Sequence, residues 1–246
     1  MNWQASHYES CRTRIIFVKI LSLLKERPVN NFGIAFFSAI IFALGTGILI
    51  LVLGKNGAFQ LINSNHNEFA DQFFKYFTHY GDGLMWTPLA LYCFFYRRKY
   101  FIAVVAGVLI STLLAQFLKR VVYPDELRPI SFLSENFPVH IIEGVTMRRS
   151  HSFPSGHTTT AFAMALIMAY MVNNKVWSVI FPLFALLAGY SRVYLAQHFP
   201  TDIFAGMCIG IVSAILALVI YRAFIKNISK RANSKSEMAS SPQADL

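Results

Sequence analysis

The chain has 246 residues, of which 55% are hydrophobic and only 14% are charged, and its formal net charge is +10. Soluble domains average about 25% charged residues, so this composition indicates a membrane protein and disfavours an ordinary soluble domain. The basic residues cluster beside apolar runs instead of forming a soluble basic stripe. Membrane orientation and contact with anionic lipid explain this placement better than nucleic acid, which we do not expect as a partner.

Residues 1–31 form a basic leader, which we expect on the cytoplasmic side. Between Arg12 and Arg27, apolar side chains fall on one helical face and polar side chains on another. This pattern is typical of a basic amphipathic helix resting on the membrane surface. A solvated start to the first membrane span explains the pattern equally well.

Six apolar runs follow, and we expect each of them to cross the membrane as a helix. The predicted fold class is therefore all-α, a polytopic membrane protein with a six-transmembrane-helix bundle. Several runs are shorter than the roughly 20 residues that a bilayer requires. The six-span domain covers residues 32–225, and the tail 226–246, poor in large apolar residues, is expected to be disordered. The expected spans are 32–54, 82–97, 100–118, 155–172, 176–190 and 202–224.

The Lys and Arg residues of the connections predict the orientation of the bundle. With both termini in the cytoplasm, 14 of these residues lie on the cytoplasmic side and 8 on the other side. The connection 119–154 and the turn 191–201 then share the non-cytoplasmic face. The polar and aromatic segment 56–81 is expected to carry a short helix that lies over the bundle.

Small residues inside the apolar runs can be explained by the packing of helices. Gly206 and Gly210 have the GxxxG spacing that lets two helices approach closely, and we expect this packing within the bundle rather than in a dimer. Cys11, Cys93 and Cys208 form no CxxC pair and no His/Cys zinc spacing. The sequence therefore predicts neither a disulfide framework nor a structural metal.

The segment SRVYLAQHFPTD, residues 191–202, places a histidine and an aspartate at the mouth of the last span. Pro200 suits the first turn of a helix, where its missing N–H costs nothing. His198 and Asp202 are four residues apart, a spacing that brings side chains together on a helix. The carboxylate can hold one ring nitrogen while the other attacks as a nucleophile. Capping of the helix by these two residues is the alternative interpretation.

The segment PSGH, residues 154–157, opens another span. The free N–H groups and the positive dipole end of a helix start suit a phosphate, which Ser155 and Gly156 would contact. Gly156 lets an anion approach the backbone closely. His157 follows directly and can donate a proton to a leaving oxygen. Taken alone, this segment favours an ordinary span start, and the phosphate interpretation depends on the other segments.

The segment KRVVYPDELRP, residues 119–129, supplies cations. Lys119 and Arg128 lie at a membrane exit, where Arg192 joins them from the turn before the last span. Arginine offers a planar fork that matches phosphate oxygens, and lysine offers a compact charge. Snorkelling at the interface is the alternative, and we assign Arg120 to it. Two histidines, one aspartate and three cations are too many ionisable groups near a bilayer to be incidental.

Together these segments resemble the signature of the type 2 phosphatidic acid phosphatase superfamily, which also contains the vanadium haloperoxidases. That signature is K-x6-RP, then PSGH, then SR-x5-H-x3-D. PSGH matches outright, and residues 191–202 match the last motif without a gap. In the first motif, eight residues instead of six separate Lys119 from Arg128. The six spans and the chain length resemble the bacterial integral-membrane lipid phosphatase branch.

The resemblance implies a mechanism that uses no cofactor and no metal, in keeping with the lack of a carboxylate cluster for Mg²⁺. His198 would attack phosphorus and form a phosphohistidine while Asp202 holds its ring. His157 would protonate the leaving group and then activate water. The phosphoryl oxygens would be bound by Lys119, Arg128, Ser155, Gly156 and Arg192.

These implications predict a lipid-phosphate phosphatase of a bacterial inner membrane, with both termini in the cytoplasm and the active site at the periplasmic interface. The expected partners are membrane lipids and a lipid phosphate substrate: undecaprenyl diphosphate, phosphatidylglycerol phosphate, phosphatidate or lipid A. The motifs bind the phosphate that these lipids share, so the choice among them and the oligomeric state stay open. A vanadate-dependent haloperoxidase-like enzyme and a non-catalytic lipid-binding or transport protein are the alternatives.

Overall fold

The computed structural model describes residues 31–132 and 137–240, with backbone alone for 229–240. The elements within these ranges are helices and short helical turns, which confirms the all-α class. The predicted amphipathic helix of the leader lies outside the described residues. The helices are α2 (Asn31–Asn63), α3 (Glu68–Phe77), α4 (Trp86–Tyr96), α5 (Phe101–Phe117), α6 (Gly156–Val172), α7 (Lys175–Tyr194) and α8 (Pro200–Ser240). The short turns are η1 (Thr78–Gly81), η2 (Gly83–Met85), η3 (Arg98–Tyr100), η4 (Leu118–Val122) and η5 (Pro129–Phe132).

The described residues contain four helices that are long and apolar enough to cross a membrane. They are 31–63, 98–122, 175–194 and 200–228, and they correspond to four of the six expected spans. The two other expected spans are present as shorter apolar helices, 83–96 and 156–172. Length and composition therefore identify a helical membrane protein.

The first long helix, α2, continues past its predicted end at residue 54 to Asn63. The predicted end coincides with an interruption, because Gly54 adopts φ 69° and ψ 172° inside this helix. Positive φ is readily adopted only by glycine. Since α2 resumes after Gly54, the segment 56–81 holds both the end of α2 and the expected short helix, α3.

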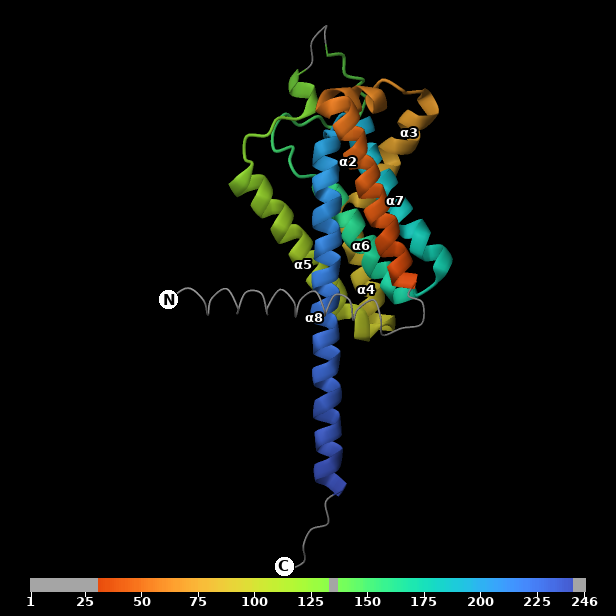
Figure 1. Cartoon of the computed structure of the whole chain (residues 1–246), viewed down its shortest axis with the longest axis vertical. Helices are drawn as coiled ribbons and strands as arrows, with labels where there is room; N and C mark the ends of the chain where they lie inside the picture. The colour runs from red at the N-terminus through yellow and green to blue at the C-terminus, as the bar shows by residue number, and fades with distance from the viewer. Residues whose placement is uncertain (1–30, 133–136, 241–246) are drawn as a thin grey trace, which may run out of the picture.

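Helix α6 forms the centre of the bundle and packs against α5, α7 and α8 (Figure 1). Small side chains such as Ala161, Ala163 and Ala165 are fully buried in it. Large apolar side chains are instead exposed on the outer helices, with Leu51 of α2 at 85% and Leu113 of α5 at 66% exposure. Large exposed apolar surfaces mark membrane or protein contact, so these faces fit contact with lipid.

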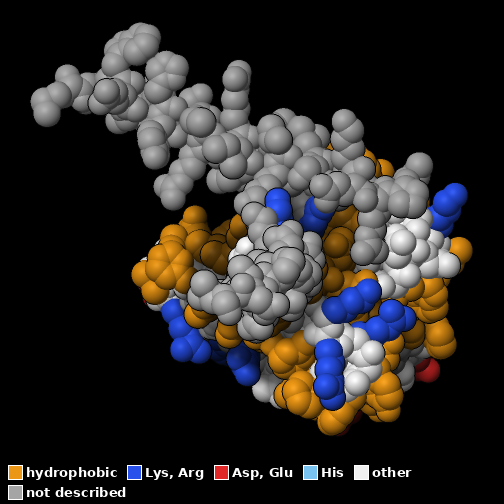
Figure 2. All heavy atoms as spheres, turned by 90° about the horizontal axis from the view of Figure 1, so that it is seen from below, with side chains coloured by type: hydrophobic (Ala, Val, Ile, Leu, Met, Phe, Trp, Pro, Cys, Tyr) orange, Lys and Arg blue, Asp and Glu red, His pale blue; other side chains and the backbone are white. Residues whose placement is uncertain are grey.

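The three segments that carry the predicted chemistry lie at one end of the bundle, where α5 ends, α6 begins and α7 passes into α8 (Figure 1). At the opposite end, the side-chain amide of Asn31 donates to the backbone carbonyl of Asn173 at 2.7 Å and joins the start of α2 to the α6–α7 turn. Figure 2 views that opposite end and shows Lys and Arg side chains gathered among hydrophobic ones. The turns α4–α5 and α6–α7 contribute the exposed Arg97, Arg98, Lys99 and Lys175.

The sequence predicts that the tail after residue 226 is disordered. Instead, α8 continues as a helix to Ser240 and projects beyond the bundle (Figure 1). Residues 226–240 contain neither proline nor glycine, the two residues that most disfavour a helix interior. The lack of large apolar residues, on which the prediction rested, is compatible with a solvated helix. Residues 241–246 lie outside the described part of the chain.

The GxxxG pair of α8 packs within the bundle, as expected. A Cβ atom added to Gly206 would lie 2.8 Å from the carbonyl oxygen of Ser155, and one added to Gly210 would lie 2.7 Å from the carbonyl oxygen of Thr159. Real Cβ atoms essentially never approach backbone so closely. The two glycines therefore allow α8 to lie directly against the first turns of α6.

We expect Gly210→Ala to lower the free energy of unfolding by about 1–3 kcal/mol, the usual cost of overpacking, because the helices α6 and α8 must separate. Thermal unfolding in detergent measures this loss, which corresponds to a fall of roughly 2–4 °C per kcal/mol in a chain of this length. Gly45→Ala is the matched control, since an added Cβ there meets nothing within 4 Å. An equal loss of stability in both variants would contradict the packing role of Gly210.

Candidate active site

His198 lies in the turn between α7 and α8 and is only 2% exposed. Its Nδ1 is 3.3 Å from Oδ2 of Asp202 in the first turn of α8. The same carboxylate oxygen accepts the backbone N–H of Phe199 at 2.9 Å. Asp202 therefore caps the start of α8 and also holds the imidazole, so both interpretations of this pair from the sequence apply.

The neighbours of His198 identify its tautomer. Nη1 of Arg128 lies 3.4 Å from Nε2 of His198. A guanidinium has donors but no acceptor, so Nε2 must face it with a lone pair. The ring proton then sits on Nδ1, which faces the carboxylate of Asp202. Nε2 then carries the lone pair that faces Arg128.

Arg128 is fixed beside this ring by backbone carbonyls. Its guanidinium donates to the carbonyls of Ser150 (3.0 Å), His151 (3.2 Å) and Gln197 (2.7 Å). Burial, followed by the charge of Arg148, lowers the pKa of Arg128 to about 10, so the group stays protonated at neutral pH. His151 takes part through its backbone carbonyl, in keeping with the absence of any predicted role for its ring.

Arg192, near the end of α7, presents a donor that no described residue satisfies. Its Nη1 donates to Oγ1 of Thr78 at 2.9 Å, and Nη2 lies 3.5 Å from Oε1 of Gln197. Its Nε is buried and has no hydrogen-bond partner among the described residues. A buried unsatisfied donor costs about 1–3 kcal/mol. An anionic oxygen bound here would remove that cost.

Lys119 lies in η4, where α5 ends in a π turn whose Tyr123 N–H donates to the carbonyl of Leu118 at 2.8 Å. A π turn widens a helix by one residue and is frequent at functional sites. The π turn therefore accommodates part of the additional residues that separate Lys119 from Arg128 when this chain is compared with the family motif. The charge of Lys119 acts on His198 and on Arg128, which places it in the same group. Arg120 is exposed, as expected for an interfacial residue.

The start of α6 is tied to the start of α8. The backbone N–H of Ser155 donates to the carbonyl of Asp202 at 3.0 Å. Oγ of Ser155 caps α6 by accepting the N–H of Thr158 at 3.4 Å, a bond that keeps the helix start ordered. A Cβ added to Gly156 would meet nothing within 4 Å, so the backbone there borders open space. This space fits the predicted close approach of an anion.

His157 belongs to the same site as His198. The charges of Arg192, Lys119 and Arg128 act on both rings, and His198 acts on His157. A Cβ added to Gly81 would lie only 2.9 Å from the carbonyl oxygen of His157, so η1 packs directly on the first turn of α6. The structure thus brings all eight predicted site residues together: Lys119, Arg128, Ser155, Gly156, His157, Arg192, His198 and Asp202.

Three side chains that the sequence did not indicate complete the site. The hydroxyl of Ser152 donates to Oδ2 of Asp202 and lies 3.5 Å from Nδ1 of His198. Thr78 of η1 and Gln197 hold the guanidinium of Arg192. Ser152 and Gln197 are close to predicted site residues in the sequence, a weak signal that could have found them. Thr78 carries no such signal because it is 114 residues from its partner.

The fold and the site define a helical membrane protein in which cationic side chains gather around the buried His198. A family model described as the PAP2 superfamily matches residues 100–226. An undecaprenyl-diphosphatase of Sulfolobus acidocaldarius is 30% identical over 154 residues, which are 62% of this chain and 71% of that protein. A lipid A 4′-phosphatase of Bacteroides thetaiotaomicron is 30% identical over 60% of this chain and 68% of its own length.

Among solved structures, Aquifex aeolicus LpxE superposes with a TM-score of 0.58 at 31% identity. That superposition covers 65% of this chain and 92% of LpxE. The matched residues 100–226 include all three signature segments and more than half of the chain. The chain belongs to the PAP2 superfamily, which confirms the resemblance inferred from its motifs.

The pKa of His198 lies well below its ordinary value because the ring is buried and because the charges of Arg128, Arg192 and Lys119 act on it. We expect Arg128→Met to raise this pKa, since removal of a nearby positive charge favours the protonated ring. Imidazole NMR of the protein in detergent micelles, assigned with His198→Gln, measures the titration. The control Arg98→Met, at the opposite end of the bundle, should leave it unchanged.

The lowered pKa of His198 also determines whether the stability of the fold rises or falls with pH. The unfolded chain binds the proton more readily than the folded one, so this residue destabilises the fold progressively as pH falls below about 6.5. The loss should be smaller in Arg128→Met than in the parent. A pKa for His198 that is unaffected by Arg128→Met would show that the two side chains do not face each other.

Proposed function

We propose that this protein is a lipid-phosphate phosphatase that uses His198 as its nucleophile. The observation that carries the proposal is the neutral imidazole whose Nδ1 is held by Asp202 and whose Nε2 faces the guanidinium of Arg128. The names of the relatives, an undecaprenyl-diphosphatase and a lipid A 4′-phosphatase, support a lipid phosphate as the substrate.

In the first step, Nε2 of His198 attacks phosphorus and the bond between phosphorus and the leaving oxygen breaks. Positive charge develops on the ring, and Asp202 stabilises it through Nδ1–H. The leaving oxygen takes a proton from His157, whose protonated form is favoured when an anionic phosphate enters the site. The products of this step are a phosphohistidine and the released alcohol or lipid phosphate.

In the second step, water attacks the phosphohistidine. His157 accepts a proton from this water, and the bond between Nε2 and phosphorus breaks, which restores neutral His198 and releases inorganic phosphate. The residues proposed to bind the phosphoryl oxygens and stabilise the charge of both transition states are Lys119, Arg128, Ser155, Gly156 and Arg192.

We further propose that all six apolar helices cross a bacterial inner membrane as one phosphatase domain over residues 32–225, with both termini in the cytoplasm. The exposed basic residues at the end of the bundle opposite the site support this orientation through the positive-inside rule (Figure 2). The site then faces the periplasm at the membrane interface. The acyl or prenyl chain of the substrate enters sideways between helices while its phosphate meets the cations.

A phosphate-release panel in detergent tests this proposal. Purified protein is assayed with undecaprenyl diphosphate, phosphatidylglycerol phosphate, phosphatidate and lipid A, each beside the His198→Gln variant. We expect release from at least one lipid and none from His198→Gln, with acid-labile ³²P on the parent protein alone. Release that persists in His198→Gln removes the mechanism, and no release from any lipid favours a binding protein. Halide oxidation with added vanadate would instead favour a haloperoxidase-like activity.

We expect Ser152→Ala to lower kcat for lipid phosphate by roughly 10–150-fold, because a hydrogen bond to a charged group is worth about 1.5–3 kcal/mol and Ser152 supports the carboxylate of Asp202. The KM should change little, since Ser152 is not among the residues proposed to bind phosphate. Ser213→Ala is the control, because Ser213 is also fully buried but donates within α8, to the carbonyl of Ile209. Equal activity of the two variants would remove Ser152 from the positioning of Asp202.

A further inference from the structure

A second cluster of ionisable side chains lies at the same end of the bundle, outside the site described above. His66 belongs to the link between α2 and α3, Asp71 to α3, and His140 to the connection between α5 and α6. Each offers one atom that can bind a metal, and these atoms all lie within 4.8 Å of one another. The signature motifs do not include any of the three residues.

The distances between His140 and Asp71 match those between two ligands of one small cation. Nε2 of His140 lies 3.2 Å and 3.1 Å from the two carboxylate oxygens of Asp71. The rings of His66 and His140 are parallel, with centroids 3.6 Å apart. Ligands that share a tetrahedral Zn²⁺ at about 2.0–2.1 Å are separated by roughly 3.3–3.4 Å. Because the two rings are parallel, their ligand nitrogens lie in parallel planes, and the exposed His66 side chain would have to rotate to direct its nitrogen at an ion held by Asp71 and His140.

Other residues fix the cluster in place. Buried Asn63 accepts the backbone N–H of His140 at 2.8 Å and donates to its carbonyl at 3.2 Å. The hydroxyl of Tyr194 donates to Oδ1 of Asp71, while Oδ2 of the same carboxylate faces Nε2 of His140. Partners of this kind orient metal ligands and raise their basicity. The backbone N–H of Asp71 also donates to the carbonyl of Asn67, at the cap of α3.

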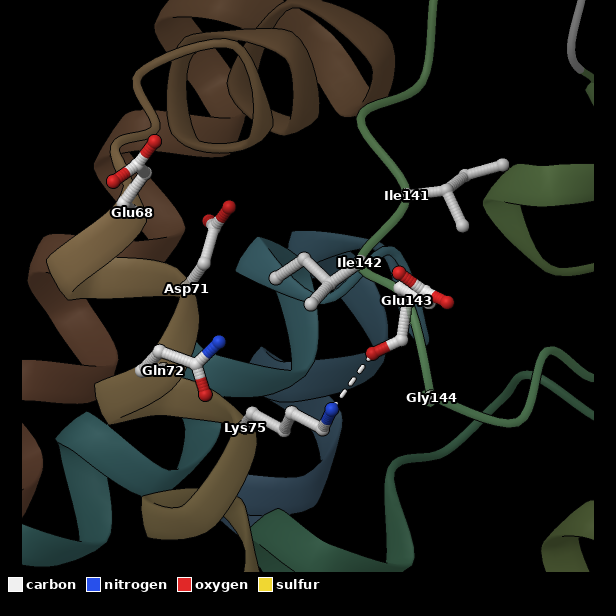
Figure 3. Close-up of a pocket in the computed structure, with 8 residues that line it drawn as sticks. All are labelled: Glu68, Asp71, Gln72, Lys75, Ile141, Ile142, Glu143 and Gly144. Carbon is white, nitrogen blue, oxygen red and sulfur yellow. Dashed lines mark hydrogen bonds between the residues drawn. The ribbon is translucent and has the colours of Figure 1, made fainter.

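The surroundings of the cluster favour a cation that can exchange with solvent. Asp71 projects from α3 into a cavity of about 600 Å³ between this helix and the connection, beside Glu68 and Glu143 (Figure 3). Lys75 also lines this cavity, where its Nζ donates to the carbonyl of Glu143 at 2.7 Å. His66 is exposed. The cavity beside Asp71 leaves room for a water molecule as a fourth ligand.

We propose that His66, Asp71 and His140 bind Zn²⁺, with a water molecule as the fourth ligand. Two imidazoles and one carboxylate suit Zn²⁺, whereas Mg²⁺ and Ca²⁺ prefer ligand sets made of oxygen. This ion takes no part in phosphoryl transfer, so the proposal is independent of the proposed function. The spacing of cysteine and histidine along the sequence predicted no metal, because His140 and Asp71 are 69 residues apart.

The ion would stabilise the segments that form one side of the candidate active site. It would join the connection at His140 to α3 and to the α2–α3 link. The same connection holds Gln197, whose Nε2 donates to the carbonyl of Thr146 at 3.1 Å. Gln197 in turn contacts Arg128 and Arg192. Metal binding should therefore stabilise the folded protein and the segment that positions its cations.

The test uses the full chain in detergent, with any affinity tag removed and metal stripped by a chelator, titrated with Zn²⁺ alone. Calorimetry should give one Zn²⁺ per chain. The Tm should rise by roughly 5–10 °C when free Zn²⁺ exceeds Kd 100-fold. Replacement of Zn²⁺ by Co²⁺ should give the visible absorption of a tetrahedral site. No saturable binding, or no rise in Tm, overturns the proposal.

His66→Phe is the decisive variant, because it keeps an aromatic ring to stack on His140 and removes the ligand nitrogen. It should lose the Co²⁺ absorption and the rise in Tm. His79→Phe changes another exposed histidine outside the cluster and should keep both. An equal response of the two variants would show that Zn²⁺ binds elsewhere on the surface.

The Zn²⁺ affinity of the Tyr194→Phe variant is a second measurement, and it distinguishes a cluster that binds metal from one that is purely structural. This substitution removes the hydroxyl that bonds to Asp71 and keeps the packed ring. The Zn²⁺ affinity should fall by about 10–100-fold, the usual effect of losing a group that orients a ligand, with one ion still bound at saturation. An unchanged affinity in Tyr194→Phe, with the chelator-treated protein folded, contradicts the assignment of Asp71 as a ligand.

Discussion

Mutual repulsion among positive charges is the physical constraint on which the site depends. Lys119, Arg128 and Arg192 all act on the buried ring of His198, and their charges also oppose one another. Such repulsion is strong where water is excluded, so the cations must be held by groups that cannot move away. Arg128 is held by three backbone carbonyls, and Asp202 supplies the negative charge nearest the ring. A phosphate bound between these cations would relieve the repulsion.

Close packing of α6 against α8 gives this arrangement its rigidity. Gly206 lets the backbone of α8 approach Ser155 at the start of α6. The N–H of Ser155 then donates to the carbonyl of Asp202, so the two helix starts are directly bonded. The start of α8, which orients His198, and the start of α6, which is proposed to bind phosphate, therefore form one structural unit. Small residues allow α6 to pack closely in the bundle, and the same close packing holds the residues of the candidate site in position.

The α5–α6 connection links this unit to the proposed zinc site. One part of it surrounds Arg128 with the carbonyls of Ser150 and His151. Another part presents His140 to Asp71, and Thr146 between them accepts a hydrogen bond from Gln197. Outside the short turns η4 and η5, the carbonyls of this segment need such contacts to stay in position, because a helix does not supply their hydrogen bonds. This explains how a long connection can hold a buried arginine.

The sequence by itself determined the helical membrane class and indicated the eight residues of the candidate site, because apolar runs and fixed motif spacings are local properties of a chain. It did not determine the helical continuation of α8 to Ser240 or the continuation of α2 past Gly54, since apolar content marks a span and not the end of a helix. Only the tertiary structure decided which side chains support the site, among them Ser152. It also decided that His66, Asp71 and His140 meet. Contacts between distant segments arise when packed helices bring loops together, and no local pattern records that approach.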